Sequence, residues 1–186
     1  HTTNVKRVYA RERGQSFPET DGMITDVPGI CLVTSYADCV PLYFVDPVKK
    51  VIGLSHSGWR GTVGKIGKVT VEKMEEEFGC DPADILGAVG PSICQDCYEV
   101  SEDVIKKFCE NYDENLWPEI FYQKENGKYQ LNLWKANESV FLESGILPEH
   151  IAVTNVCTHC NPDILFSHRT TGNERGTLSA FLALKK

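Results

Sequence analysis

The chain has 186 residues, of which 41% are hydrophobic, and this is enough to build one domain with a sizeable core. Its 26 acidic and 19 basic residues give a formal net charge of -7, which argues against nucleic acid or an anionic membrane as the main partner. No stretch approaches the roughly 18 consecutive apolar residues of a membrane helix, and the first residues lack the profile of a signal peptide. We therefore expect a single cytoplasmic domain over residues 1–186 that binds a small molecule.

The first third of the chain has the pattern of short β-strands joined by turns. Segments rich in β-branched and aromatic residues predict strands over 5–8, 30–34, 40–45 and 51–56. His56 therefore lies at a strand end. Gly58 and Gly61 follow it and permit a sharp change of direction.

The next segment has the apolar spacing of a helix over 62–78, with Gly79 as its C-terminal stop. This helix would begin at the His56 loop. Its N-terminal amides would then face the site and favour an anion such as phosphate.

The remainder of the chain alternates between helical and extended patterns. Further elements are expected as helices over 102–112 and 134–144 and as strands over 85–89, 120–123, 128–131 and 151–157. Asn126-Gly127 predicts a hairpin turn, and a final hairpin is expected between 164–169 and 177–184. Together these elements predict one mixed α/β or α+β domain with a largely non-parallel sheet.

Cysteine is frequent in this chain. The eight cysteines are Cys31, Cys39, Cys80, Cys94, Cys97, Cys109, Cys157 and Cys160. A disulfide framework is typical of smaller exported domains, so most of them are expected to be reduced thiols. Cys31 lies in an apolar run and is expected in the core.

Two Cys-x-x-Cys pairs, Cys94/Cys97 and Cys157/Cys160, provide four possible zinc ligands. Zinc ribbons separate their pairs by about 15 to 20 residues, whereas the whole of 98–156 lies between these two. Neither pair has the Pro or Gly of a thioredoxin motif. The spacing therefore disfavours both a structural zinc site and a thioredoxin-like function.

Cys39 and His56 are the most informative pair of residues. They lie in the segments Ala-Asp-Cys-Val-Pro (37–41) and Ser-His-Ser-Gly-Trp-Arg-Gly (55–61). A thiolate and an imidazole can act as a nucleophile with its base, or as two of the three protein ligands of a catalytic zinc. The two residues alone leave both interpretations open.

Several segments in order resemble the signature blocks of a known family. They are 37–41, 56–61, 90–93 with 97–100, 157–158 and 166–169. The blocks resemble those of the laccase-domain family, whose members are also called multicopper polyphenol oxidases or YfiH-like proteins. The resemblance implies layered mixed β-sheets flanked by helices, similar to a bacterial toxin deamidase that uses a Cys-His pair.

The resemblance also implies an enzymatic activity. Family members are described as purine nucleoside phosphorylases that also deaminate adenosine, and in older descriptions as copper polyphenol oxidases. The expected partners are therefore purine nucleosides and phosphate, and the expected metal is zinc or copper. No oligomeric state is implied.

A third site residue is implied by the family's Gln-x-His motif, of which His1 matches the histidine. Together with Cys39 and His56 it would complete a set of metal ligands. The family has a further segment ahead of this motif, so the chain is expected to be N-terminally incomplete.

Histidine content favours zinc over a multicopper centre. Copper clusters need many imidazoles, but the chain has five histidines and no His-x-His pair. Two His and one Cys with an open fourth position form a known catalytic zinc arrangement. We expect zinc on His1, Cys39 and His56, holding a water whose pKa is lowered toward about 7.

Charged residues near these motifs suggest further roles. Arg60 is the best local candidate to bind phosphate, and Arg169 and Arg175 match family positions and could add guanidinium contacts. Glu174 stands where the family usually has Gly. Asp38 is expected either to orient a ligand or bound water, or to serve as a turn residue.

Two other classes of function are compatible with these residues. One is a metal-free amidase or hydrolase of peptidoglycan-precursor editing, with Cys39 as nucleophile and His56 as base. The other is a metal-binding or partner-binding module without catalysis.

Overall fold

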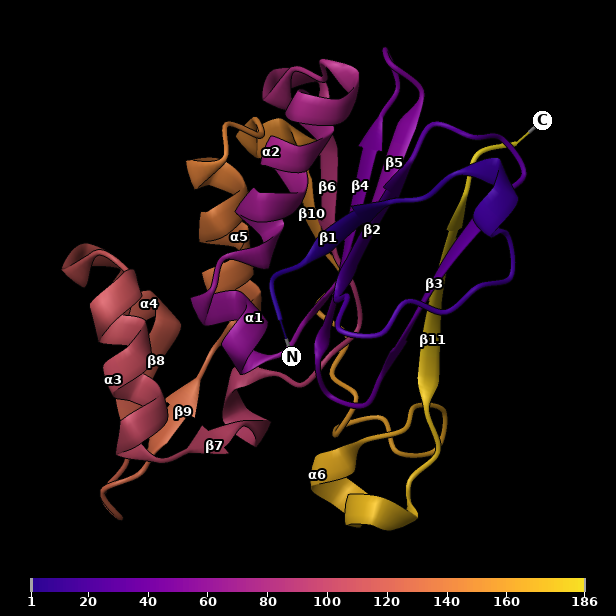
Figure 1. Ribbon diagram of the computed structural model, residues 1–186. Coiled ribbons are helices and arrows are strands. Elements are labelled where there is room, and N and C mark those ends of the chain that lie inside the picture. The colour runs from indigo at the N-terminus through magenta and orange to yellow at the C-terminus, as the bar shows by residue number, and fades with distance from the viewer. Residues whose placement is uncertain (1, 186) are drawn as a thin grey trace.

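The computed structural model describes residues 2–185, which form layers around a central six-stranded sheet (Figure 1). Its strands lie in the order β1 (Val5–Arg7), β2 (Gly22–Thr25), β5 (Val51–Ser57), β4 (Val40–Asp46), β6 (Leu86–Val89) and β10 (Ile151–Val153). The inner pairs β2/β5, β5/β4 and β4/β6 are antiparallel, whereas β1/β2 and β6/β10 are parallel. The predicted mixed α+β class with layered, largely non-parallel sheets is confirmed.

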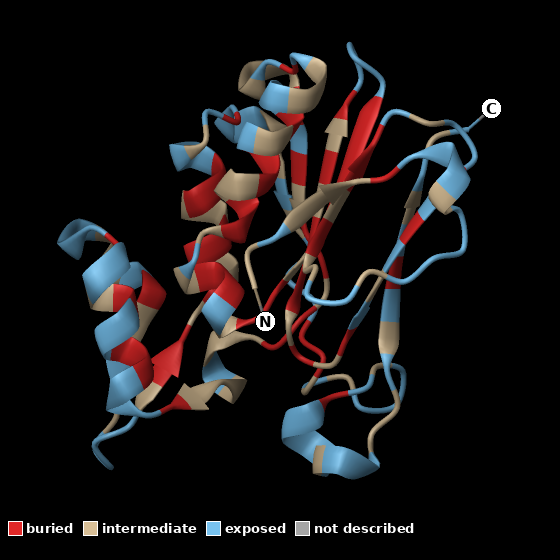
Figure 2. Ribbon diagram, viewed as in Figure 1, coloured by how far each residue is buried: buried red, intermediate tan, exposed pale blue. Residues whose placement is uncertain are grey.

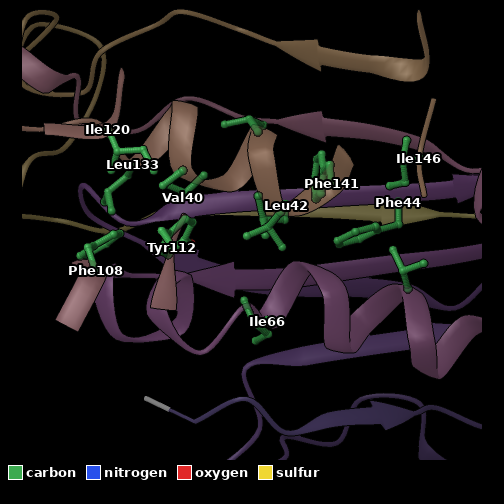
Figure 3. Close-up of a cluster of buried hydrophobic side chains, with 14 of the residues drawn as sticks. Val40, Leu42, Phe44, Ile66, Phe108, Tyr112, Ile120, Leu133, Phe141 and Ile146 are labelled. Carbon is green, nitrogen blue, oxygen red and sulfur yellow. The ribbon is translucent and has the colours of Figure 1, made fainter. Parts of the chain in front are cut away.

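Helices α2 (Ile66–Phe78) and α5 (Leu133–Glu143) cover one face of this sheet. In the core beneath them, Phe44 of β4 contacts Phe141 of α5 with ring centroids 5.2 Å apart (Figure 3). Gly87 of β6 makes room for this ring, because a Cβ there would lie 2.9 Å from Cδ2 of Phe141.

A two-stranded antiparallel sheet covers the other face. It pairs β3 (Cys31–Tyr36) with β11 (Leu178–Ala183), and the inner side chains of Leu32 and Ala180 pack with Ile52 and Leu54 of β5. Because both faces of the central sheet are covered, β4 and β5 are buried along most of their length (Figure 2).

A smaller unit flanks the helical side of the molecule. It contains α3 (Glu102–Asn111), α4 (Trp117–Ile120) and a three-stranded sheet in the order β7 (Glu99–Val100), β9 (Tyr129–Leu131) and β8 (Phe121–Gln123). The predicted hairpin turn lies between β8 and β9. Gly127 has a φ of 79° there, a left-handed value that glycine adopts without strain.

The remaining helical segments are short. They are α1 (Trp59–Val63), α6 (His168–Thr171) and the 3₁₀ turns η1 (Ala10–Glu12), η2 (Pro82–Asp84), η3 (Gln95–Cys97), η4 (Glu114–Leu116), η5 (Pro148–His150) and η6 (Gly172–Glu174). Within residues 2–185, no helix combines the length and the hydrophobicity needed to cross a bilayer.

The helix expected over 62–78 is in fact two helices. The chain breaks between α1 and α2 at Gly64 and Lys65, and Lys65 has a left-handed φ of 52°. At Gly64 the N-terminal segment passes close by, since a Cβ there would lie 2.6 Å from Cγ2 of Thr3. The prediction of an anion site at the start of one long helix is therefore not supported, because the helix that follows His56 has only five residues.

The final hairpin was also predicted incorrectly. Residues 164–167 form a loop, residues 168 and 169 begin α6, and β11 pairs instead with β3. Cys31 of β3 is exposed and does not enter the core. The apolar run over 177–184 predicted the strand β11 correctly, but such a run carries no information on which strand is its partner.

Candidate active site

His56 lies near the end of β5, and the carboxylate of Asp21 fixes its orientation. The Nδ1 of His56 lies 3.0 Å from Oδ1 of Asp21, and the backbone N–H of His56 donates to the carbonyl oxygen of Asp21 at 2.6 Å. The ring also lies against Tyr36, with centroids 5.2 Å apart. A carboxylate at Nδ1 favours the tautomer with its electron pair on Nε2, which is how metal-binding histidines are commonly oriented.

Asp21 also holds the N-terminal segment. Its second oxygen, Oδ2, accepts hydrogen bonds from the backbone N–H of Thr2 and, at 3.3 Å, from the Thr2 hydroxyl. Partial burial raises the pKa of Asp21, but the hydrogen bonds from Thr2 and His56 outweigh this and the net shift is downward. His1 itself lies outside the described residues, whereas Thr2 beside it is joined to His56 through one carboxylate.

Asp21 is a site residue that the sequence did not reveal. It directly precedes β2, a four-residue strand that was not predicted, and it lies far along the chain from His56. The pair Asp21-Gly22 reads as a turn signal. Only the closeness of β2 to β5 gives Asp21 another role.

Cys39 directly precedes β4, the strand beside β5. The register pairs Pro41 with His56, and side chains alternate along a strand, so Cys39 and His56 share one face of the sheet. Cys39 accordingly packs with the core between the central sheet and β3/β11. The structure brings together the two residues that the sequence selected.

The environment of the Cys39 thiol raises its pKa to about 11. Burial is the main cause; the nearby charges of Asp38 and Asp21 add to it, and Arg175 opposes it. Such surroundings do not activate a cysteine nucleophile, which requires a lowered pKa. A bound divalent cation, in contrast, deprotonates a coordinating thiol outright.

Asp38 has a left-handed φ of 78° and is buried. Its Oδ1 accepts from the hydroxyl of Thr158 and its Oδ2 from the backbone N–H of Arg169, each at 2.7 Å. Its carbonyl oxygen accepts from the N–H of Ile93 at 3.1 Å. Asp38 is thus a turn residue that joins three segments beside Cys39, while orienting a ligand stays a prediction for it.

A cavity of about 350 Å³ opens beside Cys39. Its walls are formed by Asp38, Cys39, Gly58, Trp59, Arg60, Ile93, Tyr98, Leu133 and His168. The guanidinium of Arg60 lies over the Trp59 ring, 4.3 Å from its centroid. Burial raises the pKa of Tyr98 to about 12, so its hydroxyl stays protonated and can donate a hydrogen bond into the cavity.

The other two predicted arginines lie close to this cavity. Arg169 lies over the Tyr98 ring at 5.1 Å, and its guanidinium donates to the carbonyl oxygen of Glu99 at 2.9 Å. Arg175 donates from Nε to Nδ1 of His168 at 3.2 Å, and its charge opposes the upward shift in the pKa of Cys39. One arginine therefore lines this small cavity and two others contact residues of its wall, an arrangement that suits an anionic ligand.

A second, larger cavity of about 620 Å³ opens beside His56. Asp21, Met23, Ile30 and Thr34 are among the residues that line it. His56 lines this cavity and Cys39 lines the smaller one, so each member of the Cys-His pair borders a cavity.

The donor set fits a single zinc ion better than a copper cluster. A thiol and a carboxylate-oriented imidazole lie on one sheet face, and the same carboxylate holds the residue next to His1. Among the described histidines, His159 bonds to Thr170 and His168 to Arg175. These contacts do not supply the clustered imidazoles of a multicopper centre.

A partly buried thiol, a carboxylate-oriented imidazole and an arginine beside a cavity are the features of a candidate enzyme active site. The comparison with known proteins agrees. The chain belongs to the family described as multi-copper polyphenol oxidoreductase laccase, whose family model matches residues 1–185. The family resemblance seen in the sequence is thereby confirmed.

Similar proteins carry names of nucleoside enzymes. The purine nucleoside phosphorylase YlmD of Bacillus subtilis is 34% identical over 196 residues, which cover 100% of this chain and 69% of that protein. The adenosine deaminase RL5 of an unknown prokaryotic organism is 35% identical over 165 residues, covering 89% of this chain and 62% of that protein.

Among solved structures, the hypothetical protein YfiH of Bacillus licheniformis superimposes with a TM-score of 0.95 at 33% identity. The match covers 100% of this chain and 72% of that chain. The predicted YfiH-like fold is confirmed.

Proposed function

We propose that the chain is a zinc-dependent purine nucleoside phosphorylase that also deaminates adenosine. The observation that carries this proposal is the Asp21 carboxylate, which joins Thr2 to His56 on the sheet face that also holds Cys39. His1, Cys39 and His56 would bind the metal. Relatives named purine nucleoside phosphorylase and adenosine deaminase support the choice of substrates.

Zinc, when bound, would supply a Lewis acid and lower the pKa of bound water. The chain's own residues perform the remaining tasks. Asp21 orients the His56 imidazole, and the three arginines near the cavity hold phosphate and neutralise its charge. For phosphorolysis, a phosphate oxygen attacks the anomeric carbon of the ribose while the bond to the purine nitrogen breaks and its electron pair leaves with the base.

The proposal includes the setting in which the enzyme works. Its partners are small purine nucleosides and phosphate, and nucleic acid and membranes are not among them, in keeping with the net charge of -7. Its location is the cytoplasm.

A metal-free amidase is the second candidate. Cys39 and His56 on one face, with Asp21 hydrogen-bonded to the histidine, resemble the order of nucleophile, base and orienting acid. The raised pKa of the Cys39 thiol counts against this candidate. A copper oxidase, the third possibility, would need clustered histidines, and the histidines within residues 2–185 do not supply such a cluster.

One assay separates these candidates. The purified protein is incubated with inosine or adenosine, with and without phosphate, and the products are separated by chromatography while its metal content is measured. Phosphate-dependent release of free base together with ribose 1-phosphate, and loss of this activity on zinc removal with recovery on zinc addition, are the expected results. An active preparation without metal, or no turnover of either nucleoside, would contradict the proposal.

A further inference from the structure

The four cysteines of the two Cys-x-x-Cys pairs meet in the folded chain. This four-cysteine cluster consists of Cys94, Cys97, Cys157 and Cys160, and its sulfur atoms all lie within 4.8 Å of one another. The Sγ atoms of Cys97 and Cys160 are 3.4 Å apart. All four are free thiols.

This spacing matches what zinc requires. Four thiolates at the usual Zn–S distance of about 2.3 Å form a tetrahedron with edges of about 3.8 Å. The observed sulfur positions need only small adjustments to reach it. The donors are four cysteines, the ligand set of many structural zinc sites.

The fold explains why the sequence spacing was misleading. Strand β10 runs parallel to β6, and the pairing continues beyond both strands as a bridge between Ser92 and Cys157. The backbone N–H of Ser92 donates to the carbonyl oxygen of Val156 at 3.1 Å, and the backbone N–H of Thr158 donates to the carbonyl oxygen of Ser92 at 3.2 Å. Residues 98–156 leave the sheet and return beside it, so their number does not determine the distance between the pairs.

The backbone around the cluster is shaped for sulfur ligands. The N–H of Cys94 donates to the sulfur of Cys157 at 3.3 Å, which joins the two pairs. Each turn is also held from outside: the Gln130 side chain donates to the carbonyl oxygen of Asp96, and that of Asn161 donates to the carbonyl oxygen of Cys157, both at 2.7 Å. Cys157 is buried and Cys160 is exposed, so a metal can enter from solvent.

We propose that the four-cysteine cluster binds one Zn²⁺ as a closed structural site. On binding, each thiol releases its proton to solvent and its sulfur forms one bond to the metal. No oxidant or reductant is needed. Because all four positions are filled by protein, this zinc holds the fold in place and leaves no position for substrate.

The residues next to the cluster contact the active site, so this zinc would help to hold the active site in place. The backbone N–H of Ile93, which precedes Cys94, donates a hydrogen bond to the carbonyl oxygen of Asp38. The hydroxyl of Thr158, which follows Cys157, donates a hydrogen bond to the carboxylate of Asp38. Tyr98, which follows Cys97, lines the cavity beside Cys39. The zinc would therefore clamp together the two loops that form one wall of the active site.

Cobalt binding tests the proposal. The protein is prepared under reducing conditions with Cys39→Ala and His56→Ala, which remove two ligands of the other site, and is titrated with Co²⁺. We expect one equivalent bound, with the thiolate charge-transfer and tetrahedral ligand-field absorption of a tetrathiolate site, and its displacement by Zn²⁺. Adding Cys97→Ser and Cys160→Ser should abolish this signal, whereas the matched pair Cys31→Ser and Cys109→Ser should leave it unchanged.

A second measurement does not depend on the folding of any variant. The unaltered protein is treated with an alkylating agent with and without one further equivalent of zinc, and the modified cysteines are mapped by mass spectrometry. Zinc should protect the four cysteines of the cluster and leave Cys31 reactive. Reactive cluster cysteines in the presence of zinc, or a disulfide pair that binds no metal after reduction, would overturn the proposal. Neither result bears on nucleoside turnover, so the two proposals stand or fall separately.

Discussion

The Cys39/His56 site and the four-cysteine cluster lie at the same end of the central sheet, but they are built differently. The first uses two different donor atoms at the ends of neighbouring strands and opens onto cavities. The second uses four identical donors on two loops and has its coordination positions filled by protein. An open site with mixed donors suits catalysis, whereas a closed site of thiols suits structure. Asp38, beside Cys39 and bonded to Ile93 and Thr158, connects the two.

The largest effect should come from removing a ligand of the open site. Cys39→Ala or His56→Ala should lower nucleoside turnover by at least about 10³-fold, because metal binding supplies several kcal/mol of charge stabilisation. The far-ultraviolet circular dichroism should be unchanged. Cys109→Ala, at a free thiol of α3 that lines neither cavity, serves as the control and should retain full turnover. An equal loss of turnover in the control would show that the loss is not specific to the ligands of the open site.

Asp21→Asn should have the next largest effect. Replacing a carboxylate that orients a metal-binding histidine commonly lowers metal affinity or activity about 10- to 100-fold. Zinc affinity is measured by competition with a chromophoric chelator, and turnover is measured in excess zinc. Asp26→Asn, at a carboxylate near the other end of β2 with a side chain 42% exposed, is the matched control. Unchanged zinc affinity in Asp21→Asn would show that this carboxylate does not support the metal.

Arg60→Ala should weaken phosphate binding. A charge-assisted hydrogen bond is worth about 1.5 to 3 kcal/mol, so the KM for phosphate should rise at least about 10-fold. The KM for the nucleoside should change much less. Steady-state kinetics with each substrate varied in turn separates these effects, and Arg11→Ala on the exposed η1 segment is the control. A rise confined to the nucleoside KM would assign Arg60 to the other substrate.

The smallest expected effect concerns Glu99, which follows Cys97 of the cluster by two residues and whose carbonyl oxygen accepts a hydrogen bond from Arg169. Its hydrogen bonds with Lys124, Asn126 and Lys128 lower its pKa to about 2. The folded pKa lies below the unfolded value of about 4.3, so this contribution to stability is present above about pH 4.3 and is lost as the pH falls toward 2.

Glu99→Gln should remove that part of the acid dependence of thermal unfolding. The fall in melting temperature between about pH 4.3 and 2 should be shallower in this variant than in the unaltered protein. Glu125→Gln, at an exposed position in the same hairpin, should leave the slope unchanged. Identical slopes in all three proteins would show that the Glu99 contacts do not contribute to stability.

The parts of the fold that could be predicted depend on local pattern. The hydrophobic runs of β4 and β5 placed Cys39 and His56 at strand ends, and the register then brought them onto one face. A turn such as Asn126-Gly127 is fixed by its own two residues, so it was also predicted correctly.

The parts that were missed depend on contacts between distant segments. Asp21 acquires its role from the pairing of β2 with β5, and the cysteine pairs meet because β10 lies beside β6. The left-handed Lys65 breaks a helix that its apolar spacing favours. None of these features can be predicted from the residues that lie next to it in the sequence.

Gly64 shows how far the active site extends from its cavities. A methyl group at this helix junction would collide with Thr3, whose neighbour Thr2 binds the carboxylate that orients His56. Gly64→Ala would therefore disturb the histidine through three successive contacts, although neither Gly64 nor Thr3 lines either cavity. For anyone redesigning this enzyme, the junction between α1 and α2 belongs to the active site, and a search for improved variants that samples only cavity-lining positions would miss it.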